Sequence, residues 1–272
     1  MTCEPLLFHA AEAVLAALAD DDRPDCLPAA VVVDWEQRDK ERRQAHARIT
    51  IGLVPSVSHD DHAALARVRR HLPQVPVICR VDGPADLDGV DVAVAGGAAE
   101  VLLPMVRHED EVDRVLEWAA GRIRVGIMLE TRDAVDRVDR LVARPLSRAY
   151  LGLVDLALDR GTPSIFSAFT DGVVDHVAAH VAGRTAFGVG GLTLPGHGDP
   201  LPAELLAGEI LRVGSQFSFL RRSFLEHVAS DPPGEGIRAV RGMLAGLALR
   251  SAEDVERDRL AFEGLARGEV PA

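Results

Sequence analysis

The sequence predicts an α/β fold, a (β/α)8 TIM barrel with an additional C-terminal helical segment. Short runs rich in β-branched residues alternate with amphipathic segments, which is the pattern of parallel strands joined by crossover helices. Several runs, such as VVV and VGIML, are almost continuously apolar, as expected for strands that are covered on both faces. Eight such units occupy about 220 residues, a length that suits the barrel.

This alternation assigns eight strands and the helices that connect them. The predicted strands are residues 5–10, 30–36, 75–81, 100–106, 124–130, 148–154, 185–190 and 216–221. Segments with apolar residues at three- and four-residue spacing follow most strands and predict the crossover helices. These segments are residues 11–19, 60–72, 109–121, 132–142 and 171–183. A doubly wound sheet is the alternative fold, but no GxGxxG follows the first strand.

Two stretches fall outside the eight units. Residues 47–57 resemble a strand but precede the helix of the second unit, so we interpret them as an extended excursion over the barrel mouth. Beyond the last strand, SDPPGEG at 230–236 is a breaker before a long amphipathic stretch. We therefore expect the barrel to occupy residues 1–229 and a helical extension to occupy residues 230–272. The extension would pack on the barrel or on a partner subunit, within the same domain.

The charge composition argues against several kinds of chemistry and partner. The chain has 30 basic and 42 acidic residues, a net charge of −12, and Lys40 is its only lysine. Because Lys40 lies in the charged run RDKERRQ, we expect a solvated amine, which is unsuited to Schiff-base catalysis. The excess of acid repels nucleic-acid phosphate and anionic lipid, so neither a nucleic acid nor a membrane is an expected partner.

The cysteines and the lengths of the apolar runs indicate the compartment. The three cysteines are an odd number without CxxC spacing, which argues against a disulfide framework and against a zinc knuckle. No run approaches the ~20 apolar residues of a membrane-spanning helix. We therefore expect a cytoplasmic protein.

Polar side chains end several of the apolar strands, at the edge where barrel enzymes carry their active sites. Glu130 ends strand five and Asp155 follows strand six. Two carboxylates on adjacent strands suit Mg²⁺, Mn²⁺ or another divalent cation, which completes its shell with water and substrate oxygens. The alternative is that Glu130 caps the next helix, because acidic residues favour the first turn.

Arg80 ends strand three and offers a planar fork for a carboxylate or a phosphate. The alternative is a salt bridge within the rim to Asp34, Glu36 or Asp82, and both roles can hold together. Asp34 and Glu36 are two residues apart, so a strand directs them to the same side. Either could bind a metal through water, orient Arg80 or act as a base.

Further residues are expected to contact a substrate. Arg107 ends strand four, and the glycine-rich stretch 187–198, which contains Gly190 and Gly191, continues from strand seven. Glycines at this place let the backbone approach an anionic group. The alternative for this stretch is a long turn.

Three segments, in order along the chain, read GGAAEVLLPMVR, VGIMLET and YLGLVDLALDRG. In order and spacing they resemble the signatures of the HpcH/HpaI aldolase and citrate-lyase beta-subunit family, of the pyruvate/phosphoenolpyruvate barrel superfamily. The resemblance covers roughly residues 30–195. It implies a homo-oligomeric barrel, a trimer or hexamer, that cleaves or forms C–C bonds of a small oxo acid through a metal-bound enolate. By position, it implies that Glu130 and Asp155 hold the cation and that Arg80 binds the substrate carboxylate.

The sequence departs from this family after strand two. Aldolases of the family read D-x-E-H there, with the histidine as base, whereas DWEQ places Gln37 at that position. A neutral amide cannot accept a proton, so Glu36, another rim group or a metal-bound water would serve, or the reaction is a different one. Gln37 then remains as a substrate contact.

The hypothesis from sequence is a divalent-metal-dependent carbon–carbon lyase that acts on a small 2-oxo or 3-hydroxy acid. Arg80, Glu36 and Asp34 are its expected catalytic residues. The alternatives are a citrate-lyase-like acyl-CoA lyase or thioesterase, and a catalytically weakened barrel that binds a ligand or a partner.

Overall fold

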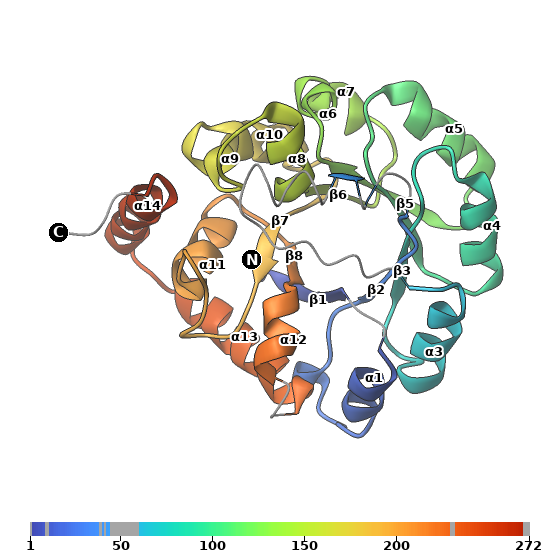
Figure 1. Cartoon of the computed structure of the whole chain (residues 1–272), viewed down its shortest axis with the longest axis horizontal. Helices are drawn as coiled ribbons and strands as arrows, with labels where there is room; N and C mark the ends of the chain where they lie inside the picture. The colour runs from blue at the N-terminus through green and yellow to red at the C-terminus, as the bar shows by residue number, and fades with distance from the viewer. Residues whose placement is uncertain are drawn as a thin grey trace.

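Eight parallel strands close into a barrel, which confirms the predicted fold class. The computed structural model describes residues 2–8, 11–37, 40, 42–43, 60–228 and 232–268. Each strand pairs with the next one along the chain and β8 pairs with β1, so the sheet has no free edge (Figure 1). The strands are β1 (Glu4–Phe8), β2 (Val31–Asp34), β3 (Val77–Arg80), β4 (Glu100–Leu103), β5 (Arg124–Leu129), β6 (Arg148–Leu151), β7 (Ala186–Leu192) and β8 (Phe217–Leu220).

Helices surround the barrel on its outer side (Figure 1). The described helices are α1 (Glu12–Ala19), η1 (Pro24–Cys26), α3 (Ala63–His71), α4 (Leu87–Ala95), α5 (Glu109–Ala119), α6 (Arg132–Asp136), α7 (Val138–Leu141), α8 (Leu153–Arg160), α9 (Ser167–Thr170), α10 (Val173–Val181), α11 (Ala203–Arg212), α12 (Arg222–His227), α13 (Pro233–Leu247) and α14 (Ala252–Ala266). The helices predicted from apolar spacing are present, except that the segment 132–142 is divided into α6 and α7. None of these helices has the length and apolarity needed to cross a membrane. The predicted excursion at 47–57 lies outside the described residues.

The pleat of the strands sorts their side chains into two cores. Successive residues of a strand point to opposite faces, so residues two apart share a face. The cluster inside the barrel consists of Leu6, Ala30, Val32, Ile78, Leu102, Met128, Tyr150, Phe217 and Phe219. Their neighbours along the strands, for example Val31 and Val33, belong to an outer core that includes residues of the surrounding helices. The two cores explain why the strands read as continuous apolar runs.

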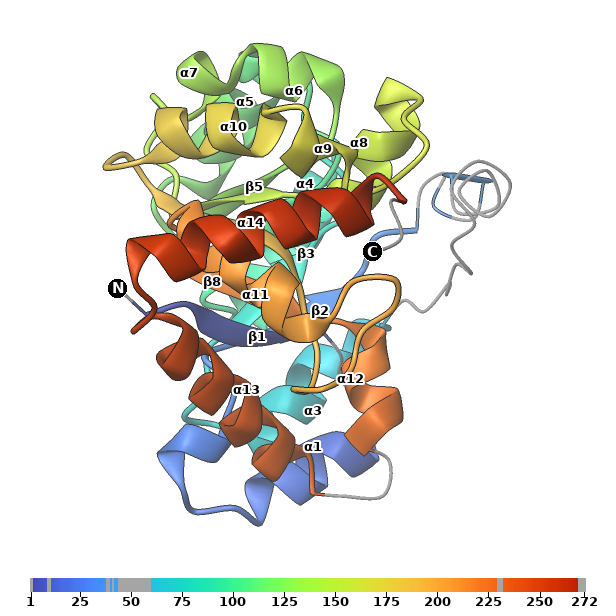
Figure 2. The same ribbon diagram turned by 90° about the vertical axis from the view of Figure 1, so that its left-hand side faces the viewer.

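The two C-terminal helices pack against the barrel of the same chain. α13 lies against η1, α11 and β1, and α14 crosses α11 (Figure 2). α14 begins with a capping box formed by Ser251 and Asp254. Its Phe262 is fully buried. The centroid of the Phe262 ring lies 6.1 Å from that of Phe166 and 5.2 Å from that of Phe169. An aromatic cluster therefore fixes α14 to the outside of the barrel.

Candidate active site

Polar side chains occupy inward-facing positions where several strands end. Asp34 is the last residue of β2, Arg80 is the last residue of β3, and Glu130 directly follows β5. Each lies two residues after an apolar residue of the inner core. Those apolar residues are Val32, Ile78 and Met128. Because side chains two residues apart share a face, all three polar groups point into the barrel at its carboxyl end, where barrel enzymes hold their active sites.

Arg80 is held by two carboxylates and an aromatic ring. Its Nε and Nη2 donate to Oδ1 and Oδ2 of Asp34, each at 2.8 Å, and Nη2 lies 3.0 Å from Oε2 of Glu36. Its guanidinium carbon lies 4.8 Å from the centroid of the Phe8 ring. Within the described residues, Nη1 has only a weak contact, 3.8 Å to Sδ of Met128. The salt bridge considered as the alternative for Arg80 is therefore present, and one arm of the guanidinium remains for a ligand.

Lys40 also belongs to this cluster. Its Nζ donates to Oδ2 of Asp34 at 2.5 Å, and the residue is 5% exposed. The expectation of a solvated amine is therefore wrong, because a charged stretch of sequence does not indicate exposure when a buried carboxylate lies within reach of the side chain. Burial alone would raise the pKa of Asp34, but the charges and hydrogen bonds of Arg80 and Lys40 outweigh burial and lower it.

Glu130 is buried next to the same cluster. It is 1% exposed, and its Oε1 accepts a hydrogen bond from the backbone N–H of Met105 at 2.8 Å. Gly152 leaves room for the carboxylate, because a Cβ at Gly152 would lie 2.5 Å from Oε2 of Glu130. Thr131 caps α6, since its Oγ1 accepts a hydrogen bond from the N–H of Ala134. The alternative that Glu130 caps this helix is therefore wrong.

Asp155 lies on a helix and not at the end of a strand. The predicted strand 148–154 is too long, because the chain leaves β6 before Gly152 and Asp155 falls in the first turn of α8. Oδ1 of Asp155 accepts a hydrogen bond from Nε of Arg43 at 2.8 Å, and Nη2 of Arg43 donates to Oε1 of Glu36. Arg43 thus links Asp155 to a carboxylate that holds Arg80.

The carboxylates of Glu130, Asp155 and Glu36 repel one another. Burial, together with the charges of Asp155 and Glu36, raises the pKa of Glu130 to about 8. A divalent cation between Glu130 and Asp155 would offset this repulsion. Within the described ranges, no group of three or more His, Cys, Asp or Glu side chains has the arrangement of a metal site. Glu130 and Asp155 could supply two carboxylate ligands to a cation such as Mg²⁺ or Mn²⁺, with water and substrate as the others.

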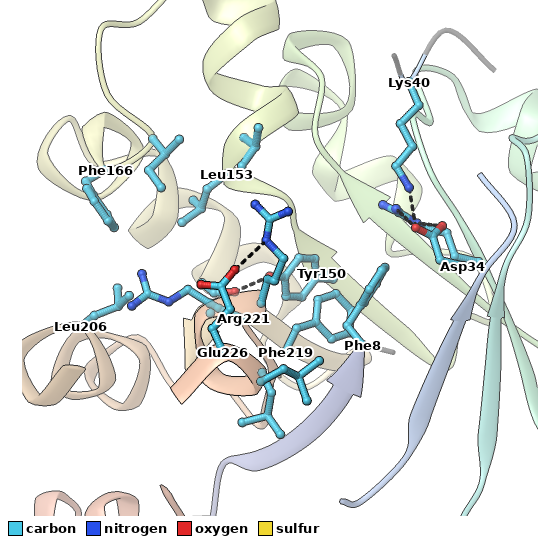
Figure 3. Close-up of a pocket in the computed structure, with 18 residues that line it drawn as sticks. Phe8, Asp34, Lys40, Tyr150, Leu153, Phe166, Leu206, Phe219, Arg221 and Glu226 are labelled. Atoms are coloured by element: carbon cyan, nitrogen blue, oxygen red, sulfur yellow. Dashed lines mark hydrogen bonds and ion pairs between the residues drawn. The ribbon is translucent and has the colours of Figure 1, made fainter. Parts of the chain in front are cut away.

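A cavity of about 680 Å³ opens over the Arg80 cluster (Figure 3). Asp34 and Lys40 lie at one side of it, whereas Phe166 and Leu206 lie at the other. Gly190 and Gly191, which the sequence predicts as substrate contacts, also line the cavity. Glu36, Glu130 and Asp155 are not part of the lining.

Arg107 and Gln37 are not among the residues that line the cavity. Nη1 and Nη2 of Arg107 donate to Asp133 and Asp159, each at 2.9 Å. Gln37 is exposed, and its backbone N–H donates to Oδ1 of Asp82 at 2.6 Å. The structure therefore does not bring these two predicted substrate contacts together with Arg80.

Two arginines of the site are absent from the sequence-based prediction. Arg43 lies in the run RDKERRQ, where no pattern distinguishes the arginine that reaches the rim. Arg221 lines the cavity just after β8, two residues after the inner-core Phe219. For Arg221 a signal does exist, because the two-residue period of Phe217, Phe219 and Arg221 places it on the inward face.

Several solved structures are similar to this barrel. No protein-family profile and no curated protein matches the sequence. An HpcH/HpaI aldolase/citrate lyase family protein from Burkholderia cenocepacia is similar in structure, with a TM-score of 0.62 and 14% identity, over 87% of this chain and 95% of that chain. Citrate synthase SbnG is similar with a TM-score of 0.59 and 17% identity, over 84% of this chain and 91% of that chain. For macrophomate synthase the TM-score is 0.57 and the identity 14%, over 84% and 81% of the two chains. The chain thus shares the barrel fold of the family that its sequence segments resemble.

Proposed function

We propose that the protein is a divalent-metal-dependent carbon–carbon lyase that acts on a small 2-oxo or 3-hydroxy acid. The observation that carries the proposal is the buried guanidinium of Arg80, fixed by Asp34 and Glu36 at the carboxyl end of the barrel and next to the buried Glu130 and the partly exposed Asp155. The fold that the chain shares with known lyases and synthases supports the same class of reaction.

Arg80 is suited to bind the carboxylate of the substrate. Burial alone would lower the pKa of Arg80, but the charges of Asp34 and Glu36 hold it above its ordinary value, so the group is a permanent cation. Its Nε and Nη2 are engaged by protein carboxylates, and Nη1 is the arm that we assign to the substrate. Asp34 and Glu36 act through Arg80, because they fix the orientation of its guanidinium before the substrate binds. The substrate therefore does not have to order this side chain itself.

Glu130 and Asp155 would hold Mg²⁺ or Mn²⁺. When bound, such a cation supplies positive charge that polarises a keto oxygen and stabilises the negative charge developing there as the C–C bond breaks. Lys40 contributes a further positive charge at the rim. Since its Nζ is engaged by the buried carboxylate of Asp34, we assign it no role as an imine-forming nucleophile.

Two measurements test the proposal. Isothermal calorimetry should show Mn²⁺ binding to the parent chain and a loss of at least about tenfold in affinity for Glu130→Ala and Asp155→Ala. Asp113→Ala is the matched control, because Asp113 is an exposed carboxylate paired with Arg144 on the outer surface. Unchanged Mn²⁺ binding in both site variants would overturn the metal assignment.

Solvent deuterium exchange into the methyl protons of pyruvate tests the chemistry. We expect exchange with metal and parent protein, and its loss in Arg80→Gln. Exchange that occurs only with an acyl-CoA thioester would favour the acyl-CoA lyase or thioesterase. The absence of exchange with both compounds, despite metal binding, would favour a barrel that binds a ligand without turning it over.

A further inference from the structure

Arg221 is a cation of the cavity wall that the proposed reaction does not use. It follows β8 directly, two residues after the inward-facing Phe219, and lines the cavity (Figure 3). The stem of its side chain passes close to Gly191, since a Cβ at Gly191 would lie 2.5 Å from Cγ of Arg221 and 3.0 Å from its Cδ. A glycine on β7 and the pleat of β8 therefore direct this guanidinium into the mouth of the barrel.

The charge of Arg221 is not compensated within the described part of the chain. Its Nε is buried and has no hydrogen-bond partner there. Burial lowers the pKa of Arg221, and no described carboxylate offsets this effect, although a guanidinium remains protonated at neutral pH. The other two arginines of the cavity differ, because Arg80 is paired with Asp34, and Nε of Arg222 lies 3.4 Å from Oε1 of Glu226. A buried donor without a partner is costly unless a ligand supplies the acceptor.

An apolar floor separates Arg221 from Arg80. Phe8 lies beneath the Arg80 guanidinium, its ring centroid is 5.1 Å from that of Phe219, and the rings of Phe219 and Tyr150 are 4.1 Å apart. Arg80 ends β3 and Arg221 follows β8, so the two lie three strands apart in the barrel order. Neighbouring strands are about 4.8 Å apart, so the strands that carry Arg80 and Arg221 are separated by roughly 14 Å along the sheet. Both side chains point from the sheet into the barrel.

We propose that Arg221 forms a second anion subsite, which binds a distal carboxylate or phosphate of a substrate whose 2-oxo acid end lies at Arg80. The apolar carbons between the two acidic groups then lie on the rings of Phe8, Phe219 and Tyr150. The assignment of the oxo acid end to Arg80 rests on the proposed function. The substrate class is thereby narrowed from any small oxo acid to one that carries acidic groups at both ends.

Three ligands of equal chain length test the subsite by calorimetry. They are 2-oxohexanoate, which ends in a methyl group, 2-oxoadipate, which ends in a carboxylate, and 2-oxo-5-phosphonopentanoate, which ends in a phosphonate. We expect the parent protein to bind the better of the two diacids about tenfold to a hundredfold more tightly than 2-oxohexanoate, the range of a charge-assisted hydrogen bond. Tighter binding of 2-oxoadipate assigns the subsite to a carboxylate, and tighter binding of the phosphonate assigns it to a phosphate.

Substitutions of cavity-lining residues test whether Arg221 causes the preference for diacids. Arg221→Gln should remove the preference for the diacids and leave the affinity for 2-oxohexanoate unchanged, whereas Arg221→Lys should restore part of the preference. Gly191→Ala should weaken the preference as well, since the new methyl group displaces the Arg221 side chain. Arg222→Gln is the matched control, which removes a neighbouring arginine that is paired with Glu226. An equal loss of preference in Arg222→Gln would overturn the subsite in favour of a diffuse positive field.

The outcomes separate the subsite from the lyase reaction. Equal affinities for 2-oxohexanoate and both diacids, with deuterium exchange into pyruvate intact, would overturn the subsite alone. A preference for diacids that depends on Arg221, without exchange and without metal binding, would overturn the lyase alone and keep the subsite. If none of the three acids binds, both proposals fall.

Discussion

Asp34 balances the charges at the rim of the barrel, because it accepts hydrogen bonds from both Arg80 and Lys40 while buried. Replacing it would leave two buried cations without their shared partner. Removing one member of a buried ion pair typically costs more folding stability than the intact pair contributes.

Asp34→Asn is therefore expected to lower the free energy of unfolding by about 3 kcal/mol at pH 7. The pKa of Asp34 is lowered in the folded protein, so its contribution is fully present above the unfolded pKa of about 4 and is lost as the pH falls through the lower folded pKa. Urea denaturation at several pH values should show the difference between parent and variant shrinking below about pH 4. Asp113→Asn, in a partly exposed surface pair with Arg144, should cost less than about 1 kcal/mol. A difference that does not change with pH would contradict the charge-based explanation.

Arg43 contacts Asp155, one of the two carboxylates that we assign to the cation, and so places a positive charge next to it. Arg43→Gln should raise the affinity for Mn²⁺ by roughly tenfold, because like charges near the site oppose cation binding. Calorimetric titration measures the Mn²⁺ affinity of parent and variant, and Arg144→Gln on the outer surface is the control. Weaker Mn²⁺ binding in Arg43→Gln would show instead that Arg43 is needed to orient Asp155.

At the scale of single elements, the turn between β6 and α8 affects the site because it contains a glycine, whose missing side chain leaves room for Glu130. Gly152 lies in this turn, and a Cβ there would lie 2.5 Å from Oε2 of Glu130. Gly152→Ala should therefore displace Glu130 and weaken Mn²⁺ binding by about tenfold, although neither proposed ligand is altered. The circular dichroism spectrum should stay that of the parent.

Gly246→Ala provides the comparison for this variant. Gly246 lies within α13, and a Cβ there would have no atom within 4 Å. This change should leave Mn²⁺ binding unaltered and stabilise the helix by roughly 0.5–1 kcal/mol. If the two glycine variants behaved alike, the steric argument for Gly152 would fail.

Elements were more predictable from sequence than the contacts between them. The strands could be located because an apolar, β-branched run covered on both faces has few other interpretations, and the same logic placed Asp34, Arg80 and Glu130 at strand ends. The predicted end of β6 lies too late because YLGLV is apolar across the strand, the turn and the start of α8. The burial of Lys40 was not predictable, since it depends on a contact with Asp34 that local composition does not encode.

At the scale of the whole molecule, the C-terminal helix supports a wall of the cavity from outside. Phe262 of α14 packs on Phe166, and Phe166 lines the cavity. A residue of the C-terminal extension thus packs on a side chain that lines the cavity.

Phe262→Ala should cost about 3–5 kcal/mol of stability, the usual range for deleting a buried phenylalanine side chain, and should loosen α14. Limited proteolysis would then cut within residues 252–266 faster than in the parent chain. Leu260→Ala is the control, because Leu260 lies on the same helix but is 57% exposed. Equal protease resistance of Phe262→Ala and parent would show that α14 is held by other contacts.

The burial of Lys40 has a practical consequence for following the barrel mouth in solution. An endoproteinase specific for lysine has one peptide bond to cut in the whole chain, and the side chain it must recognise is 5% exposed and paired with Asp34. The appearance of the two fragments on a gel would therefore report how often the rim opens around this residue. An acid bound across the mouth should slow the appearance of those fragments, so the chain carries its own single-site reporter of ligand occupancy.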